Sequence, residues 1–202
     1  MIAVVDYGIG NLRSAEKALQ HLGADARLTS DEHEIANADA VVLPGVGNFG
    51  ACMHALRESG LEAVTVEATA DGRPFLGICV GMQMLFDGSN ESPGVKGLGV
   101  VAGRITRLPD SVRLPQMGWN TLERTPTSRL VAGLADPAWC YFVHTYAPEP
   151  SDDAVVAAWC DNGRRFAAAI ERGPLWATQF HPEKSGAVGL ALLDNFVAAA
   201  AA

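Results

Sequence analysis

The segment Gly77-Ile78-Cys79-Val80-Gly81 decides the fold of this chain. An extended apolar stretch at residues 75–76 leads into it, and the apolar run at residues 82–86 predicts a helix after it. The two glycines allow a sharp turn and a close backbone approach, which a cysteine that only filled a core would not require. At the start of a helix, the helix dipole favours the thiolate form of a cysteine. The segment therefore predicts a strand, a tight turn and a helix that together present a reactive thiol.

A second segment, Phe180-His181-Pro182-Glu183, lies about a hundred residues downstream and contains side chains that can act together with Cys79. The apolar run at residues 175–180 predicts a strand that delivers His181 to its end, and Glu183 follows at once. Taken singly, a cysteine in an apolar stretch is usually a small core residue, and a histidine beside a proline is usually structural. Together Cys79, His181 and Glu183 predict a catalytic triad of nucleophile, base and orienting carboxylate.

Length, charge and hydropathy narrow the class of protein. The 202 residues fit one domain spanning residues 1–202, and the net charge of −8 argues against nucleic acids and anionic membranes as partners. No apolar run approaches the ~20 residues that a membrane span needs. The chain starts directly in a strand pattern without the basic start and cleavage site of a signal peptide, so we expect a cytoplasmic protein.

The cysteines and histidines do not indicate a metal site. The four cysteines show no C-x-x-C spacing, and we expect reduced thiols rather than disulfides. Cys140 and His144 form the one close Cys/His pair, and their strand-like surroundings favour a place in the core over zinc binding. We expect neither a metal nor a cofactor.

Strand and helix patterns alternate in the first half of the chain, which predicts an α/β fold with a mostly parallel sheet and helices on both faces. The expected strands there are residues 2–6, 26–29, 40–43 and 75–78, and the expected helices are residues 11–20, 48–59 and 61–70. In the second half, turns separate further strand patterns, and we expect antiparallel strands that extend the same sheet. These are residues 97–108, 139–144, 155–160, 166–170 and 175–178, before a closing helix at residues 185–201.

A glycine-rich stretch follows one of these strands, at Pro44-Gly45-Val46-Gly47-Asn48-Phe49-Gly50. Its G-x-G-x-x-G spacing matches a dinucleotide fingerprint, but the acidic residue expected ~20 residues later is replaced by a helical pattern. A second interpretation is an oxyanion loop that works together with the N–H group of Val80, the residue after the nucleophile. An ordinary turn from strand to helix remains the third.

Two further motifs allow two interpretations each. The stretch Leu114-Pro115-Gln116-Met117-Gly118-Trp119-Asn120 reads as a connecting segment whose Met and Trp either join the core or form an exposed patch for a partner. The stretch Tyr7-Gly8-Ile9-Gly10-Asn11-Leu12 follows the first strand, where α/β sheets place their ligands, and it also fits a plain turn and helix cap.

In the combination of these motifs the chain resembles the class I glutamine amidotransferases, and among them the glutaminase subunits of imidazole glycerol phosphate synthase. The resemblance covers essentially the whole chain. It is carried by residues 6–12, 44–50, 77–83, 94–99, 115–120, 141–146 and 181–185. Val80 is a small departure because the family often has leucine there, and only its backbone N–H is needed.

The resemblance implies a reaction and a partner. Cys79 would attack the side-chain amide of glutamine, His181 would move protons, and Glu183 would orient His181. The family pattern places oxyanion donors at Val46, Gly47 and Val80, and substrate contacts at Gln83, Thr145 and Tyr146. The ammonia would pass to a separate cyclase subunit in a heterodimer. Expected residues of that interface are Asn11, Met117, Trp119 and Lys184, with Tyr146 as a further candidate.

Three rival functions stay open at this point. One is the amidotransferase subunit of a different synthase, against which the motifs at residues 7–11 and 117–120 argue. Another is a peptidase or chaperone of the related cysteine-elbow superfamily, which usually has histidine where this chain has Val80. The last is a catalytically silent subunit that keeps the fold for assembly only.

Overall fold

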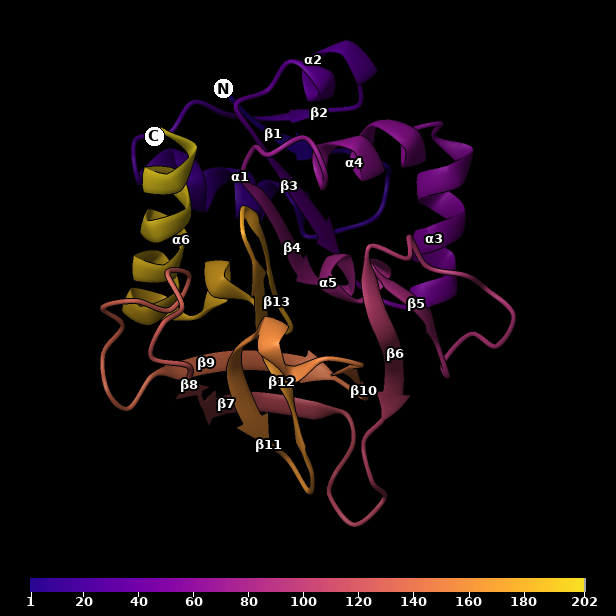
Figure 1. Ribbon diagram of the computed structural model, residues 1–202, viewed down its shortest axis with the longest axis vertical. Helices are drawn as coiled ribbons and strands as arrows, with labels where there is room; N and C mark the ends of the chain where they lie inside the picture. Colours follow the sequence, from indigo (N-terminus) through magenta and orange to yellow (C-terminus); the bar gives the residue numbers. More distant parts are fainter. Residues whose placement is uncertain (202) are drawn as a thin grey trace.

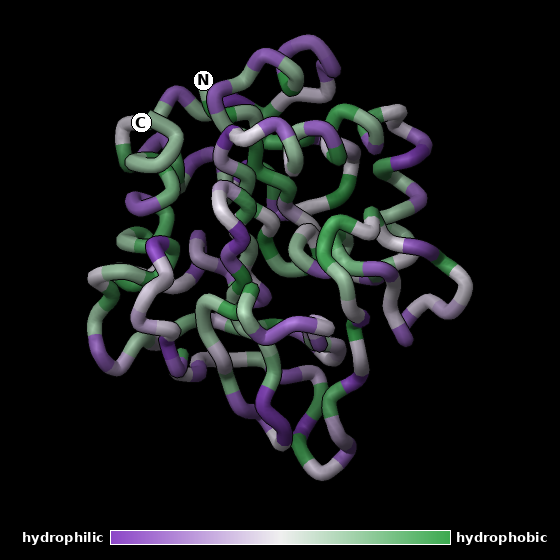
Figure 2. Tube along the Cα trace, in the orientation of Figure 1, coloured by the Kyte–Doolittle hydropathy of each residue, from purple (hydrophilic) through white to green (hydrophobic). Residues whose placement is uncertain are grey.

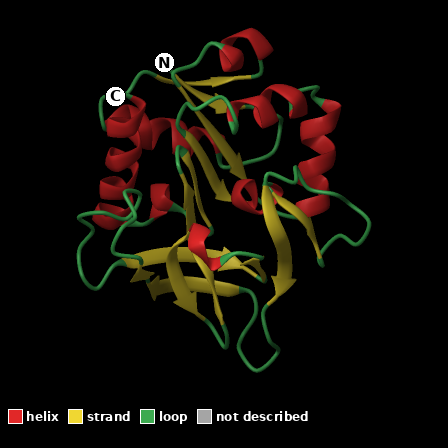
Figure 3. Ribbon diagram, viewed as in Figure 1, coloured by secondary structure: helices red, strands yellow, loops and turns green. Residues whose placement is uncertain are grey.

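The computed structural model describes residues 1–201. Figure 1 shows strands in the middle of the molecule with helices to either side of them, and Figure 3 shows the same separation by secondary structure. The predicted α/β fold class is confirmed.

The large sheet has the strand order β2-β1-β3-β4-β13-β12-β11-β8. Its parallel part consists of β1 (Ile2–Val5), β2 (Ala26–Thr29), β3 (Ala40–Gly45), β4 (Phe75–Cys79) and β13 (Leu175–Thr178). Residues of β1, β3, β4 and β13 are buried throughout, as expected of strands covered on both faces. Figure 2 shows the hydrophobic residues gathered along this central region.

Helices cover both sides of that sheet (Figure 1). On one side α1 (Leu12–His21) packs against α6 (Gly186–Ala200), and on the other α2 (Glu32–Ala36) packs against α4 (Glu62–Ala68). The chain also forms α3 (Phe49–Glu58), α5 (Val80–Met84), and the short 3₁₀ turns at Asp153–Val155 and Pro182–Lys184. The predicted helices at residues 11–20, 48–59, 61–70 and 185–201 correspond to α1, α3, α4 and α6, whereas α2 was not predicted.

Strands from the second half extend the sheet only in part. β12 (Arg165–Arg172), β11 (Val156–Asp161) and β8 (Glu123–Arg124) add antiparallel to its edge as expected. β13 instead runs parallel to β4. β9 (Trp139–His144) pairs with β7 (Gln116–Thr121) in a separate two-stranded sheet, so the connecting segment expected at residues 114–120 is in fact largely a strand.

A third sheet contains β10 (Tyr146–Pro150), β6 (Val101–Arg107) and β5 (Phe86–Ser89), in that order. The prediction of a helix over residues 82–86 was wrong at its end, because α5 stops at Met84 and Phe86 begins β5. The expected strand over residues 97–108 also begins later, at Val101. The early end of α5 and the late start of β6 have the same cause. Residues 98–101 fold back and donate hydrogen bonds to the carbonyls of Met84, Leu85 and Phe86.

Candidate active site

The segments predicted to be catalytic meet at the carboxyl ends of three neighbouring strands. β4 lies between β3 and β13, with Gly45 paired with Cys79 and Thr178 paired with Ile78. The carboxyl ends of parallel strands share one edge of the sheet, and open α/β sheets bind ligands there. The register therefore brings together the loop after β3, the cysteine at the end of β4 and the histidine after β13.

Cys79 sits on the turn that the sequence predicts. Its backbone has φ 56° and ψ −113°, in the left-handed half of conformational space that non-glycine residues avoid. Gly81 makes this turn possible, since a Cβ there would lie 1.9 Å from the carbonyl oxygen of Leu43. The strained cysteine is 3 % exposed, and α5 begins with the next residue.

His181 and Glu183 form the expected pair. The Nδ1 atom of His181 lies 2.8 Å from Oε1 of Glu183, and the same Oε1 accepts a hydrogen bond of 3.1 Å from Nδ2 of Asn11. The second carboxylate oxygen, Oε2, is buried without a partner. Asn11 was predicted as an interface residue, and the structure places its amide in direct contact with Glu183 of the predicted triad.

Burial alone lowers the pKa of His181, but its hydrogen bonds with Cys79 and Glu183 outweigh that effect and raise the pKa to about 9. The protonated imidazolium is thus favoured in the folded protein. His144, by contrast, has its pKa lowered to about 4 because burial dominates, so it stays neutral.

The segment that carries His181 is fastened to β9. The N–H of His181 donates to the carbonyl of Tyr141 at 3.0 Å. Ser185 ties the same two residues together, because its Oγ donates to the carbonyl of His181 and accepts from the N–H of Tyr141. The position of His181 therefore depends directly on the backbone of β9.

The raised pKa of His181 predicts a pH-dependent contribution to stability. The stabilisation is fully present below the unfolded pKa of about 6.5 and is lost as the pH rises through about 9. We expect the wild-type protein to have a higher free energy of unfolding than His181→Asn at pH 6. This advantage should be about 3 kcal/mol smaller at pH 10. Denaturant titrations at both pH values measure this difference, with the exposed His33→Asn as control. A difference that does not change with pH would contradict the charge state assigned to His181.

A cavity of about 460 Å³ opens at Cys79, within the size range of small-molecule sites. Its lining includes Cys79 and His181 together with Val46, Gly47 and Val80, the residues predicted as oxyanion donors. Gly47 has φ 87°, a conformation that favours glycine. The geometry brings a thiol, its base and the N–H-bearing backbone of two loops to one space, and this arrangement suits acyl transfer.

The predicted substrate contacts lie beside this cavity but are not part of its lining. Gln83 is buried, and its Nε2 donates to the carbonyl of Tyr146 at 3.1 Å and to Oε1 of Gln179 at 2.9 Å. Thr145 and Tyr146 are half-buried in the same region. Their role toward substrate stays a prediction.

Gln179 is a site residue that the sequence analysis missed. It is fully buried, and its Nε2 lies 3.7 Å from Sγ of Cys79. Because Gln83 holds its Oε1, the amide nitrogen is turned toward the sulfur. An amide residue within the apolar run of residues 175–180 was the available signal, since a buried polar side chain needs a partner.

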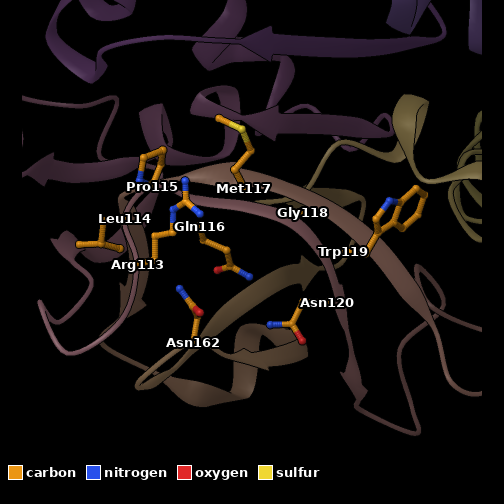
Figure 4. Close-up of a pocket in the computed structure, with 9 residues that line it drawn as sticks. All are labelled: Arg113, Leu114, Pro115, Gln116, Met117, Gly118, Trp119, Asn120 and Asn162. Atoms are coloured by element: carbon orange, nitrogen blue, oxygen red, sulfur yellow. The ribbon is translucent and has the colours of Figure 1, made fainter.

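The predicted interface residues divide into two groups. Asn11 and Lys184 line the cavity at Cys79. Met117 and Trp119 lie on β7 and are 66 % and 54 % exposed, so of the two interpretations of this motif the exposed patch is the one observed. Figure 4 shows their side chains on one side of the strand and those of Gln116 and Asn120 on the other, and all four residues belong to the lining of a separate cavity of about 440 Å³.

Within residues 1–201, no group of three or more His, Cys, Asp or Glu side chains is arranged to hold a metal ion. The four cysteines are unpaired. None of the helices in this part of the chain is long and apolar enough to cross a membrane.

Comparison with known proteins identifies the family of this chain. The model of the family "Glutamine amidotransferase class-I" matches residues 3–200. The chain belongs to the class-I glutamine amidotransferase family. The predicted family is thereby confirmed. That prediction rested on the turn at Cys79 and on His181 and Glu183, all of which this amidotransferase has.

Close relatives of this amidotransferase share the name "Imidazole glycerol phosphate synthase subunit HisH". The protein from Methanothermobacter thermautotrophicus is 51 % identical over 197 residues, which covers 98 % of each chain. The protein from Deinococcus radiodurans is 47 % identical and covers 96 % of this chain and 92 % of its own. A solved structure described as a glutamine amidotransferase matches all of both chains with a TM-score of 0.78 at 22 % identity, which supports the fold alone.

Proposed function

We propose that this chain is the glutaminase subunit of a cytoplasmic imidazole glycerol phosphate synthase, with residues 1–202 forming one amidotransferase domain. The observation that carries the proposal is the cavity that joins Cys79 and His181 to the loop at residues 44–47, in a chain whose full-length relatives bear that synthase's name. Its substrate is glutamine, and its partner is a separate cyclase subunit in a heterodimer.

The proposed reaction uses residues in the places described above. The sulfur of Cys79 attacks the side-chain amide carbon of glutamine, and the carbonyl oxygen becomes an oxyanion facing the N–H groups of Val80 and of Val46 or Gly47. His181 gives a proton to the leaving nitrogen, which departs as ammonia and leaves a γ-glutamyl thioester. His181 then takes a proton from water, which attacks the thioester and releases glutamate. Glu183 and Asn11 hold the imidazole in orientation throughout.

The surface beside this cavity supports a partner that covers it. In the antiparallel pair of β7 and β9, Met117 lies opposite Val143, and Trp119 lies opposite Tyr141. Cross-strand partners share one face of a sheet, so these side chains form a continuous outer face. The rings of Trp119 and Tyr141 pack edge to face, with 5.8 Å between their centroids. Val143 also lines the cavity at Cys79. The outer face of β7 and β9 thus runs directly into the mouth of the cavity.

A partner on this face would exclude water from the released ammonia, which a proton from solvent would convert to unreactive ammonium. It would also press on β9, the strand that holds His181 through the carbonyl of Tyr141. If the partner covers the exposed Met117 and Trp119, it can both seal the path of the ammonia and act on the triad through β9.

Glutamate release from glutamine tests the proposed function. We expect weak release by the chain alone and strong stimulation by a histidine-pathway cyclase together with the phosphoribulosyl aminoimidazole-carboxamide ribonucleotide on which it acts. If the cyclase does not change the rate of glutamate release, the glutaminase activity is supported and this partner is rejected. Absence of activity under both conditions would favour a silent assembly subunit.

The outer face of β7 and β9 carries its own prediction. Replacing Trp119 by Glu places a charge among apolar side chains, and we expect the Kd for the cyclase to rise at least about 30-fold, as for an interface hot spot. Titration calorimetry or fluorescence anisotropy measures this change. His33→Glu, which adds the same charge on the distant exposed helix α2, should leave the Kd unchanged. Equal affinities for Trp119→Glu and wild type would remove this face from the interface.

A further inference from the structure

Two buried donors lie behind residues 44–47, the end of β3 and the two residues after it, which we call the oxyanion loop. The phenol of Tyr7 donates to the carbonyl of Pro44 at 2.8 Å, and the thiol of Cys52 donates to the carbonyl of Val46 at 3.2 Å. Tyr7 follows β1 and Cys52 belongs to α3, so two separate elements hold one short loop. Cys52 is fully buried and Tyr7 is 4 % exposed, and neither lines the cavity at Cys79.

These two hydrogen bonds determine which way the loop's N–H groups point. In a planar trans peptide the C=O and N–H groups point in opposite directions. Since the carbonyl of Val46 is turned toward Cys52 in the core, the N–H of Gly47 is turned away from the core. The bond from Tyr7 to Pro44 fixes the peptide on the other side. The Gly45–Val46 peptide, whose N–H belongs to Val46, therefore lies between two held units.

Both donors keep their protons at neutral pH. Burial raises the pKa of the Cys52 thiol, and this effect outweighs the hydrogen bonds with Tyr7 and with the backbone of Val46, which lower it. Burial is also the largest cause that raises the pKa of Tyr7. A thiol and a phenol that stay protonated remain donors to the loop carbonyls over the whole pH range in which a triad of this kind works.

We propose that Cys52 and Tyr7 are positioning residues that clamp the carbonyls of Val46 and Pro44, so that the oxyanion loop presents its N–H groups to the substrate at Cys79. This inference rests on the proposed function, because it assigns the oxyanion donors to that loop. The clamp acts on the transition state, where the oxyanion exists, and much less on binding of the uncharged amide. Its loss should therefore lower kcat and leave KM for glutamine nearly unchanged.

The test compares Cys52→Ala, which removes the donor, with Cys52→Ser, which restores one of similar size. Cys160→Ala is the matched control, because Cys160 is also a buried thiol but lies on β11. Glutamate release is measured at saturating glutamine in the complex with the cyclase and its ribonucleotide, and again by the chain alone. We expect kcat to fall about tenfold in Cys52→Ala with KM within twofold, and Cys52→Ser to recover at least half of the wild-type kcat.

A loss of less than threefold in Cys52→Ala overturns the proposal, and so does a loss that Cys52→Ser does not reverse or that Cys160→Ala shares. If Cys52→Ala does not fold, as judged by its melting temperature, Tyr7→Phe is measured against the same threefold limit. Each variant is scored against wild type under the same condition. A failure of the cyclase to stimulate wild type is therefore a failure of the proposed function, which leaves the clamp to be scored on the chain alone.

Discussion

Replacing Cys79 by Ala is expected to reduce glutamine hydrolysis by about 10⁴ to 10⁶-fold, the loss seen when a triad nucleophile is removed. Without the sulfur no thioester can form, and the remaining groups can only bind glutamine and polarise its amide. Glutamate release at saturating glutamine, with the cyclase and its ribonucleotide present, measures this loss. Because Ala keeps the Cβ and inherits the same strained backbone, the fold should be retained.

Cys160→Ala provides the control, since it makes the same chemical change at a buried thiol away from the triad. A diazoketone analogue of glutamine should form one covalent adduct per chain with wild type and with Cys160→Ala, and none with Cys79→Ala, as measured by mass spectrometry. Residual hydrolysis above about one per cent in a folded Cys79→Ala would mean that another group is the nucleophile.

The reactive core of the molecule could be read from the sequence because its signals are local. The turn at Cys79 is encoded by glycines within two residues of it, and the pairing of His181 with Glu183 spans two residues. The strands at residues 26–29, 139–144 and 175–178 were predicted with their observed bounds. The last two are largely apolar runs, a pattern typical of buried strands.

The parts that sequence reasoning missed depend on contacts between distant residues. The hydrogen bond from Asn11 to Glu183 joins residues 172 positions apart, and the contact of Gln179 with Cys79 spans 100 positions. A local pattern carries no record of either partner. β10 was missed because it contains Pro148 and Pro150, and it tolerates them as an edge strand paired only with β6.

Pairing partners were likewise not predictable from strand patterns. In residues 116–120 the exposed Met117 and Trp119 alternate with less exposed residues, yet Gly118 lies between them and disguised the strand. Whether β9 would join the large sheet or pair with β7 was decided by packing across the molecule. The consequence is functional, because the separate sheet of β7 and β9 places Trp119 and Met117 outside while its backbone holds His181.

Val46→Pro is expected to lower cyclase-stimulated glutaminase activity by about 10² to 10³-fold, the usual loss for one oxyanion donor. Proline lacks the backbone N–H, so this variant removes a donor without touching the triad. If a turn of the Gly45–Val46 peptide is what the cyclase controls, the same variant should also lose most of the stimulation, since no donor is left to be supplied. The ratio of glutamate release with and without the liganded cyclase measures this effect.

Val46→Ala is the matched control, because it shortens the side chain and keeps the N–H. It should stay within a few-fold of wild type in both conditions. Two results would then separate the candidate donors. A stimulated Val46→Pro enzyme with normal kcat would show that the N–H of Gly47, held outward by the bond from Cys52 to the carbonyl of Val46, serves the oxyanion together with Val80. A loss confined to Val46→Pro would assign that donor to Val46, and the bonds from Cys52 and Tyr7 would then act by holding the peptides on either side of it.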